Sequence, residues 1–267
     1  MSTTAYTVAR PGSTTPVELT VDEVGTAGHP FLLLHGGAGP TSVLPFATYL
    51  AQNRPARVLV PTNPGFNATP RPDDLADVRA LAGLYVALLE QLDLRDVTVV
   101  GNSIGGWVAA EIALLASPRV SSIVIVNAVG LVVPDHPVAD FFSLTLDQLT
   151  DLSYDDPSRF RLDPTGFSDA QKAIMATNRQ AIAVYAGRDM TDPTLAARLA
   201  AVTVPTLVLW GQSDRVVDPD YGRAYAAAIP GSTYHPLSGT GHLPQLETPA
   251  LALAPIWDFA DKHATDR

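Results

Sequence analysis

Short runs of apolar residues with few polar interruptions recur along the chain, at residues 30–35, 57–60, 97–100, 120–126 and 206–210. A strand with one face in water alternates polar and apolar residues, so solid runs of this length predict strands that are buried on both faces. Segments with helical spacing of apolar residues separate the runs, most clearly over residues 73–94, with Pro72 near the start. Buried strands that alternate with helices predict an α/β fold with a mostly parallel sheet covered on both sides.

Two stretches depart from this alternation. Residues 4–24 contain two segments in which polar and apolar residues alternate, and these predict an antiparallel hairpin. Residues 131–192 contain no strand-like run, and the strand–helix alternation resumes only after them. We therefore expect residues 131–195 to form a helical cap, inserted into a core made of residues 1–130 and 196–267.

The composition limits the partners and the chemistry of this chain of 267 residues. Hydrophobic residues make up 46% of it and the net charge is −10, so it can bury a large core but is poorly suited to phosphate backbones or anionic membranes. It has no cysteine, which excludes disulfides, thiolate metal ligands and a cysteine nucleophile. The N-terminal residues do not resemble a signal peptide, and the apolar stretches fall short of the ~18 residues that cross a membrane. We expect a cytoplasmic protein that acts on a small molecule, binds neither nucleic acid nor membranes, and is a monomer or a homodimer.

The most specific motif is a G-x-S-x-G pattern at residues 101–105, with Ser103 at its centre. It directly follows the predicted strand at 97–100 and opens a helix predicted over 104–116. A serine in this strand–turn–helix setting is typical of a nucleophile elbow. The free N–H groups at the start of the helix would favour the negative charge that develops there. The alternative interpretation is that Ser103 only caps the helix.

A serine nucleophile needs a base, and the base needs an acid that orients it. His242 lies in a glycine-rich loop before the last predicted helix, where a side chain can reach over the edge of the sheet. Asp214 follows the strand at 206–210, at the carboxyl end where functional groups of open α/β sheets collect. Asp218 and Asp220 are the alternatives for this role. Ser103, Asp214 and His242 occur along the chain in the order Ser, Asp, His.

Acyl transfer at a serine also needs two donors for the oxyanion. The amide of Ile104 would be one donor and that of Gly37 the other, with Ala38 as the alternative to Gly37. We expect His35 to brace this glycine-rich loop rather than to act as the base. A phosphate-binding loop is disfavoured, because the sequence has neither the Gly-Lys-Ser/Thr ending nor the G-x-G-x-x-G pattern. No metal is implied, since the six histidines are scattered and none pairs with carboxylates at a ligand spacing.

Four motifs together resemble the α/β-hydrolase superfamily: HGGAGP at 35–40, GNSIGG at 101–106, WGQSD at 210–214 and GTGHLPQLETP at 239–249. The resemblance covers nearly the whole chain. It implies an eight-stranded, mostly parallel sheet, a cap that roofs an apolar pocket, and no cofactor. It also implies Ser103 as nucleophile, His242 as general base, Asp214 as its orienting acid, and the amides of Gly37 and Ile104 as the oxyanion hole.

Several branches of the superfamily do not fit these residues. Haloalkane dehalogenases and epoxide hydrolases attack with aspartate, whereas position 103 is serine. Gly37 stands where cofactor-free haloperoxidases usually have an aromatic residue, and Leu243 where hydroxynitrile lyases have lysine. Prolyl aminopeptidases bind the substrate amine with cap glutamates, and residues 131–195 contain none.

The interpretation that remains is a serine hydrolase that cleaves a small, apolar carboxylic ester or lactone through an acyl-enzyme. One alternative is hydrolysis of a carbon–carbon bond in meta-cleavage-type 2-oxo acids, for which Arg179 or Arg188 would bind the substrate carboxylate. Another is a non-catalytic ligand-binding protein on the same scaffold. The candidate substrate contacts are Ala38, Phe141, Phe142, Arg179 and Leu243.

Overall fold

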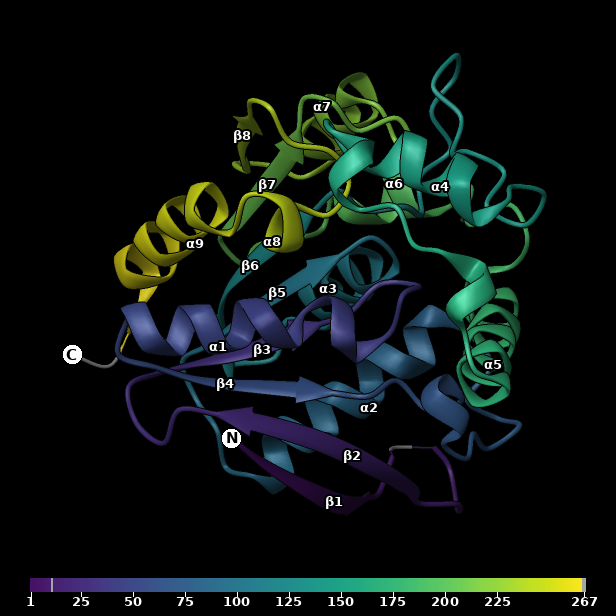
Figure 1. Cartoon of the computed structure of the whole chain (residues 1–267). Coiled ribbons are helices and arrows are strands. Elements are labelled where there is room, and N and C mark those ends of the chain that lie inside the picture. Colours follow the sequence, from purple (N-terminus) through teal and green to yellow (C-terminus); the bar gives the residue numbers. More distant parts are fainter. Residues whose placement is uncertain (11, 266–267) are drawn as a thin grey trace.

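The structure, a computed structural model, describes residues 1–10 and 12–265. Its centre is an eight-stranded sheet in the spatial order β1-β2-β4-β3-β5-β6-β7-β8 (Figure 1). The strands are β1 (Ser2–Val8), β2 (Val17–Val24), β3 (His29–Leu34), β4 (Ala56–Pro61), β5 (Val97–Asn102), β6 (Val120–Val126), β7 (Thr206–Gly211) and β8 (Thr233–Leu237). The pairs β1–β2 and β2–β4 are antiparallel, and all pairs from β4 to β8 are parallel. This confirms the predicted α/β fold class and the hairpin expected over residues 4–24.

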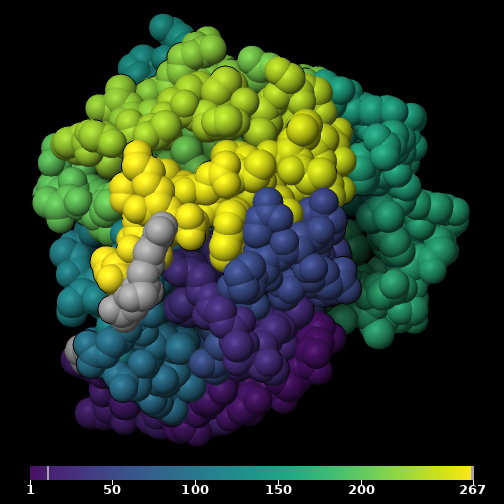
Figure 2. Space-filling view, turned by 90° about the vertical axis from the view of Figure 1, so that its left-hand side faces the viewer, coloured from purple at the N-terminus to yellow at the C-terminus, as the bar shows by residue number. Residues whose placement is uncertain are grey.

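Helices cover both faces of the sheet, as the solid apolar runs require. Helices α1 (Leu44–Asn53) and α9 (Pro249–His263) pack on one face. Helices α2 (Val78–Gln91), α3 (Ile104–Leu115) and α7 (Pro219–Ala228) pack on the other. Neighbouring residues of a strand point to opposite faces of the sheet. Val99 therefore packs on the side of α2, α3 and α7, and Val100 on the side of α1 and α9. In Figure 2 the yellow C-terminal residues lie at the surface beside the blue segment around residue 50.

Helix α2 is shorter than the 73–94 that the spacing predicts. It begins at Val78, because the side chain of Asp77 accepts a hydrogen bond from the amide of Ala80 at 2.7 Å and caps the helix there. The residues before it serve another contact, since Asp74 pairs with Arg10 at 2.7 Å. The helix was therefore predicted correctly, and its start was not.

The chain between β6 and β7, called here the β6–β7 segment, is helical in part. It contains α4 (Leu146–Ser153), α5 (Asp169–Ala186), α6 (Leu195–Leu199), and short 3-10 turns at Pro157–Arg159 and Pro164–Gly166. Both α4 and α5 start with a complete capping box, Thr145 with Gln148 and Ser168 with Gln171. Figure 1 shows α4 and α5 beyond the carboxyl ends of the central strands.

Gly130, near the start of the β6–β7 segment, pairs with residues 190–192, which precede α6. The amide of Gly130 donates to Met190 O at 3.1 Å, and the amide of Asp192 donates to Gly130 O at 2.7 Å. Gly130 has a φ of 117°, and a Cβ there would lie 2.7 Å from the ring of Trp107. Only glycine fits this position without strain. Across residues 1–10 and 12–265, no helix combines the length and the apolar character needed to cross a membrane.

Candidate active site

The turn between β5 and α3 holds Ser103 in a conformation that few side chains adopt. Its φ is 59° and its ψ is −122°. Glycines on both sides make the turn possible: a Cβ on Gly101 would lie 2.0 Å from Gly105 O, and a Cβ on Gly105 would lie 2.4 Å from Leu34 O. Backbone strain of this kind is concentrated at functional sites, and here it presents a serine at the carboxyl edge of the sheet.

His242 and Asp214 form a buried pair at the same edge. His242 Nδ1 lies 2.8 Å from Asp214 Oδ2, and the two side chains are 7% and 0% exposed. The other oxygen of Asp214 accepts the amides of Val216 and Val217 at 2.8 and 3.1 Å. Because a carboxylate accepts hydrogen bonds, the Nδ1–H of His242 is the donor in this pair, and Nε2 takes no part in it.

Asn102 joins the serine turn to the histidine loop. Its Nδ2 donates to His242 O at 2.9 Å, so the residue before Ser103 contacts the backbone of the residue that supplies the imidazole. Of the three aspartates considered for the orienting role, Asp214 is the one bonded to His242, whereas Asp218 bonds His136. The structure thus brings Ser103, Asp214 and His242, predicted from separate motifs, to one edge of the sheet.

The loop after β3 lies against the serine turn. A Cβ on Gly36 would lie 2.9 Å from Ser103 Cβ, and the amide of Gly39 donates to Gly36 O at 3.1 Å. Gly37 and Ala38 occupy the corners of this tight turn, whose own hydrogen bond uses neither of their amides. Ile104 is the first residue of α3, where helix geometry offers its amide no acceptor within the helix. The described contacts therefore assign no hydrogen-bond acceptor to the amides of Gly37 and Ile104, which an oxyanion hole requires of its donors.

His35 braces this loop, as predicted. Its Nδ1 lies 2.8 Å from Gly36 O, and its Nε2 accepts the amide of Asn63 at 3.0 Å. Complete burial lowers the pKa of His35 to about 4. The ring is therefore neutral at pH 7, with both nitrogens bonded to the backbone, so it is not available as a base.

The family of the chain follows from comparison with known sequences. The model of the Alpha/beta hydrolase family matches residues 31–256, which run from β3 into α9 and include Ser103, Asp214 and His242. The protein belongs to this family. The structure agrees with that match in three features: the order of the strands, the serine flanked by glycines and the His–Asp pair.

Several relatives of this hydrolase are named after a substrate. A 2-hydroxy-6-oxo-2,4-heptadienoate hydrolase from Pseudomonas putida is 28% identical over 256 residues, which cover 86% of this chain and 88% of the relative. A 2-hydroxymuconate semialdehyde hydrolase from Pseudomonas putida is 27% identical over 247 residues, with coverages of 82% and 83%. Among solved structures, a thermophilic esterase from Thermogutta terrifontis has a TM-score of 0.77 at 24% identity, with coverages of 98% and 100%. That structural likeness supports the fold.

Residues of the β6–β7 segment lie directly on the loop after β3. A Cβ on Gly37 would lie 2.8 Å from Ile182 Cδ1 and 3.8 Å from Phe141 Cζ. Phe141 and Phe142 meet edge to face with ring centroids 5.3 Å apart, and the guanidinium of Arg179 lies 5.0 and 5.4 Å from those centroids. The structure thus brings three of the predicted contact residues near Gly37. Ile182 was missed, because nothing distinguishes it from the other apolar residues of its helix.

The other two predicted contact residues flank the site. Ala38 is exposed at the corner of the turn, and Leu243 follows His242 and is partly buried at the start of α8 (Pro244–Glu247).

Two polar contacts that the sequence did not reveal hold helix α5 in place. Asn178 Oδ1 accepts the amide of Asn67, and the hydroxyl of Tyr185 donates to Pro64 O, each at 2.8 Å.

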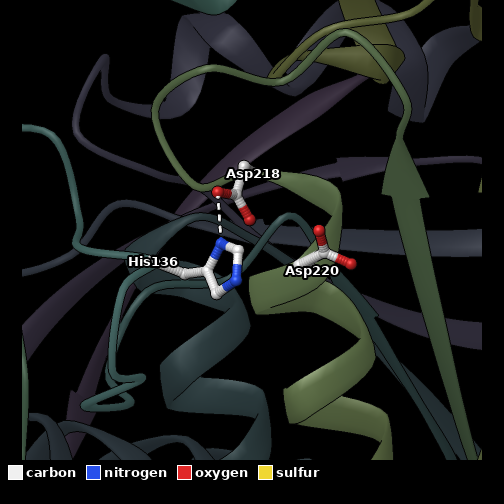
Figure 3. A group of neighbouring side chains, drawn as sticks. All are labelled: His136, Asp218 and Asp220. Atoms are coloured by element: carbon white, nitrogen blue, oxygen red, sulfur yellow. Dashed lines mark hydrogen bonds and ion pairs between the residues drawn. The ribbon is translucent and has the colours of Figure 1, made fainter.

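A second polar group lies at the start of α7, where His136, Asp218 and Asp220 each offer a ligand atom within 4.8 Å of the others (Figure 3). His136 Nδ1 bonds Asp218 Oδ2 at 2.7 Å, and Asp218 Oδ1 caps α7 by accepting the amide of Tyr221 at 2.9 Å. The hydrogen bond to Asp218 raises the pKa of His136. The sequence did not suggest the group, because His136 is distant from both aspartates along the chain. Ion pairing and helix capping account for its contacts, and we assign no metal to it.

Proposed function

We propose that the protein is a serine hydrolase that cleaves a small, apolar carboxylic ester or lactone through an acyl-enzyme. The observation that carries this proposal is the buried Asp214–His242 pair at 2.8 Å, whose histidine is bonded through its carbonyl to Asn102, the residue before a serine held at a φ of 59°. His242 Nε2 takes the hydroxyl proton while Ser103 Oγ bonds the carbonyl carbon. The amides of Ile104 and Gly37 stabilise the oxyanion.

The remaining steps follow from the same groups. His242 returns its proton to the departing alcohol as the carbon–oxygen bond breaks, which leaves the acyl group on Ser103. Water then attacks the acyl carbon, again losing a proton to Nε2, and the carboxylic acid leaves as the proton passes back to Ser103 Oγ. Asp214 holds the imidazole in the required tautomer by accepting the hydrogen bond from Nδ1. With a lactone the departing alcohol stays attached to the acid.

The β6–β7 segment would act as the cap of this site, with residues 131–195 inserted into a core of residues 1–130 and 196–267. Two observations support this role. Ile182 and Phe141 contact the loop that supplies Gly37, and Asn178 and Tyr185 bond α5 to the loop after β4. The apolar side chains of Ile182 and Phe141 favour an apolar acyl group over a charged one.

The activated serine can be tested without knowing the substrate. A fluorophosphonate probe should add once to the wild-type chain, as read by intact mass, and Ser103→Ala should abolish the adduct. Ser238→Ala, which removes an exposed hydroxyl near the histidine loop, is the matched control and should be labelled at the wild-type rate. Absence of an adduct on the folded wild-type protein would instead support a non-catalytic, ligand-binding role.

A second candidate reaction is hydrolysis of a carbon–carbon bond in a 2-oxo acid of the meta-cleavage type. It is favoured by the names of the two Pseudomonas putida relatives and by two cationic side chains near the site. Arg179 donates to Phe141 O at 2.9 Å, and Arg188 lies 5.6 Å from the ring of Phe142. Within residues 1–10 and 12–265 neither arginine forms an ion pair, so each could bind a substrate carboxylate.

This candidate makes a separate prediction about Arg179. If the substrate is an acid, Arg179→Gln should raise KM for a 2-hydroxy-6-oxo dienoate by about 10- to 100-fold, because a charged hydrogen bond contributes about 1.5–3 kcal/mol. KM for a neutral p-nitrophenyl ester should change little. Arg95→Gln is the matched control, since Arg95 is exposed, pairs with Asp93 and precedes β5, at the opposite end of that strand from Ser103. Equal changes in KM for the acid and the ester would count against the carbon–carbon reaction.

A further inference from the structure

The backbone of the dipeptide that carries the base is bonded at all four of its polar groups. Gly241 O accepts from Asn127 Nδ2 at 2.7 Å, and His242 O accepts from Asn102 Nδ2 at 2.9 Å. The amide of Gly241 donates to Glu247 Oε2 at 2.6 Å, and the amide of His242 donates to Ser153 O at 2.6 Å. Three of these partners belong to the sheet edge or to α8, and the fourth, Ser153, belongs to the end of α4 in the β6–β7 segment.

Glu247 connects the same two parts a second time. Its side chain lies on α8 and the residue is 9% exposed. While Oε2 holds the amide of Gly241, Oε1 accepts the amides of Asp155 and Asp156 at 2.8 and 3.3 Å. One buried carboxylate therefore binds the histidine loop on one side and the chain after α4 on the other. Hydrogen bonds from N–H groups to an ionised carboxylate are about twice as strong as neutral ones.

The contact between these two parts leaves no room between them. A Cβ on Gly241 would lie 2.2 Å from Ser153 O and 2.8 Å from Tyr154 Cα. The absence of a side chain at Gly241 is thus what allows the carbonyl of Ser153 to reach the amide of His242. Movement of residues 153–156 away from the sheet would remove a hydrogen bond from His242 itself.

We propose that Glu247 is a positioning residue for the general base, and that residues 153–156 must be docked against the histidine loop for His242 to work on Ser103. This inference rests on the proposed role of His242. It makes the α4 end of the β6–β7 segment part of the catalytic apparatus. A displacement of a reacting group by about 1 Å can cost about 100-fold in rate, so a loosened loop lowers kcat even when the fold survives.

The test is Glu247→Gln, measured as kcat, KM and the rate of fluorophosphonate labelling. A glutamine offers one oxygen and one NH2 group where all the facing groups are N–H donors, so the contact with either Gly241 or Asp155 must break. We expect kcat and the labelling rate to fall by about 10- to 100-fold, with KM within about twofold of the wild-type value. Glu247→Asp, which keeps the charge, should recover part of this loss.

Asp96→Asn is the matched control for a purely structural effect. Asp96 is also buried, at 8% exposure, and its carboxylate accepts the amide of Thr265 at 2.8 Å, but it lies at the opposite end of β5 from Ser103. This variant should lower the melting temperature and leave the labelling rate unchanged. If Glu247→Gln does not fold, Ser213→Ala replaces it. The Ser213 hydroxyl donates to the side chain of Asp155, so this variant removes a different contact that holds residues 153–156 in place. The labelling rate should then fall a few-fold.

Two results would overturn the inference while leaving the proposed function intact. One is a wild-type protein labelled at Ser103 together with a folded Glu247→Gln variant of unchanged kcat and labelling rate. The other is an equal loss of labelling in Asp96→Asn, which would show that kcat follows stability. Absence of labelling in the wild type would instead contradict the proposed function.

Discussion

Asp214→Asn is expected to lower kcat by about 10³- to 10⁴-fold while the protein remains folded. In the native structure one carboxylate oxygen holds the amides of Val216 and Val217, and the other accepts from His242 Nδ1. Asparagine keeps an oxygen for the two amides but turns its NH2 group toward the imidazole. Nδ1 must then accept, the ring proton moves to Nε2, and His242 can no longer take the proton of Ser103.

The matched control for this substitution is Asp218→Asn. Asp218 lies in the same loop region but bonds His136 and caps α7, so its loss should change kcat by less than about threefold. Both variants are measured by steady-state kinetics and by the rate of fluorophosphonate labelling. A kcat for Asp214→Asn within tenfold of the wild type, or a larger loss in Asp218→Asn, would remove Asp214 from the proposed mechanism.

Gly105→Ala is expected to destabilise the protein by about 3 kcal/mol or more. The added Cβ would lie 2.4 Å from Leu34 O and 2.7 Å from His35 O, and both are backbone atoms that cannot rotate away. Helix α3 must therefore move off β3, which also shifts the amide of Ile104 from the loop that contains Gly37. We expect a melting temperature lower by roughly 6–12 °C and a loss of activity of about 100-fold in the protein that remains folded.

Gly83→Ala separates this effect from the general effect of alanine. Gly83 lies inside α2, and a Cβ there would meet nothing within 4 Å. Alanine at this position should stabilise the protein by about 0.5–1 kcal/mol, because glycine lowers helix stability by that amount. Denaturant unfolding of the two variants therefore tests a predicted difference in sign. A melting temperature of Gly105→Ala close to that of the wild type would contradict the close approach of α3 and β3.

The central part of the fold could be predicted because its signals are local. Strands buried on both faces leave solid apolar runs, and the runs at 30–35, 97–100 and 206–210 became β3, β5 and β7. Strand β8 left no such run, since it lies at the edge of the sheet, is mostly exposed and contains Pro236. The start of α2 was misplaced because capping by Asp77 and pairing of Asp74 with Arg10 outweigh the helical spacing of nearby residues.

The residues of the candidate site could likewise be predicted only where the signal is local. Ser103, Asp214 and His242 stand in short motifs whose chemistry is recognisable, and the structure brings them to one edge of the sheet. The groups that hold them there were not predictable. Glu247 and Asp155 are 92 residues apart in the sequence, and their contact depends on how distant elements pack rather than on any local pattern.

Within the β6–β7 segment, Gly130 and Thr191 pair in a parallel bridge, so the residues between them begin and end at neighbouring points. A stretch with adjacent ends can grow, shrink or be exchanged as one block of sequence while the spacing of β6 and β7 stays the same. In the proposed role of this segment as a cap, such changes would alter the substrate range without any change at the serine turn. The freedom has one limit, because every replacement must still present a carbonyl to the amide of His242 where Ser153 does now.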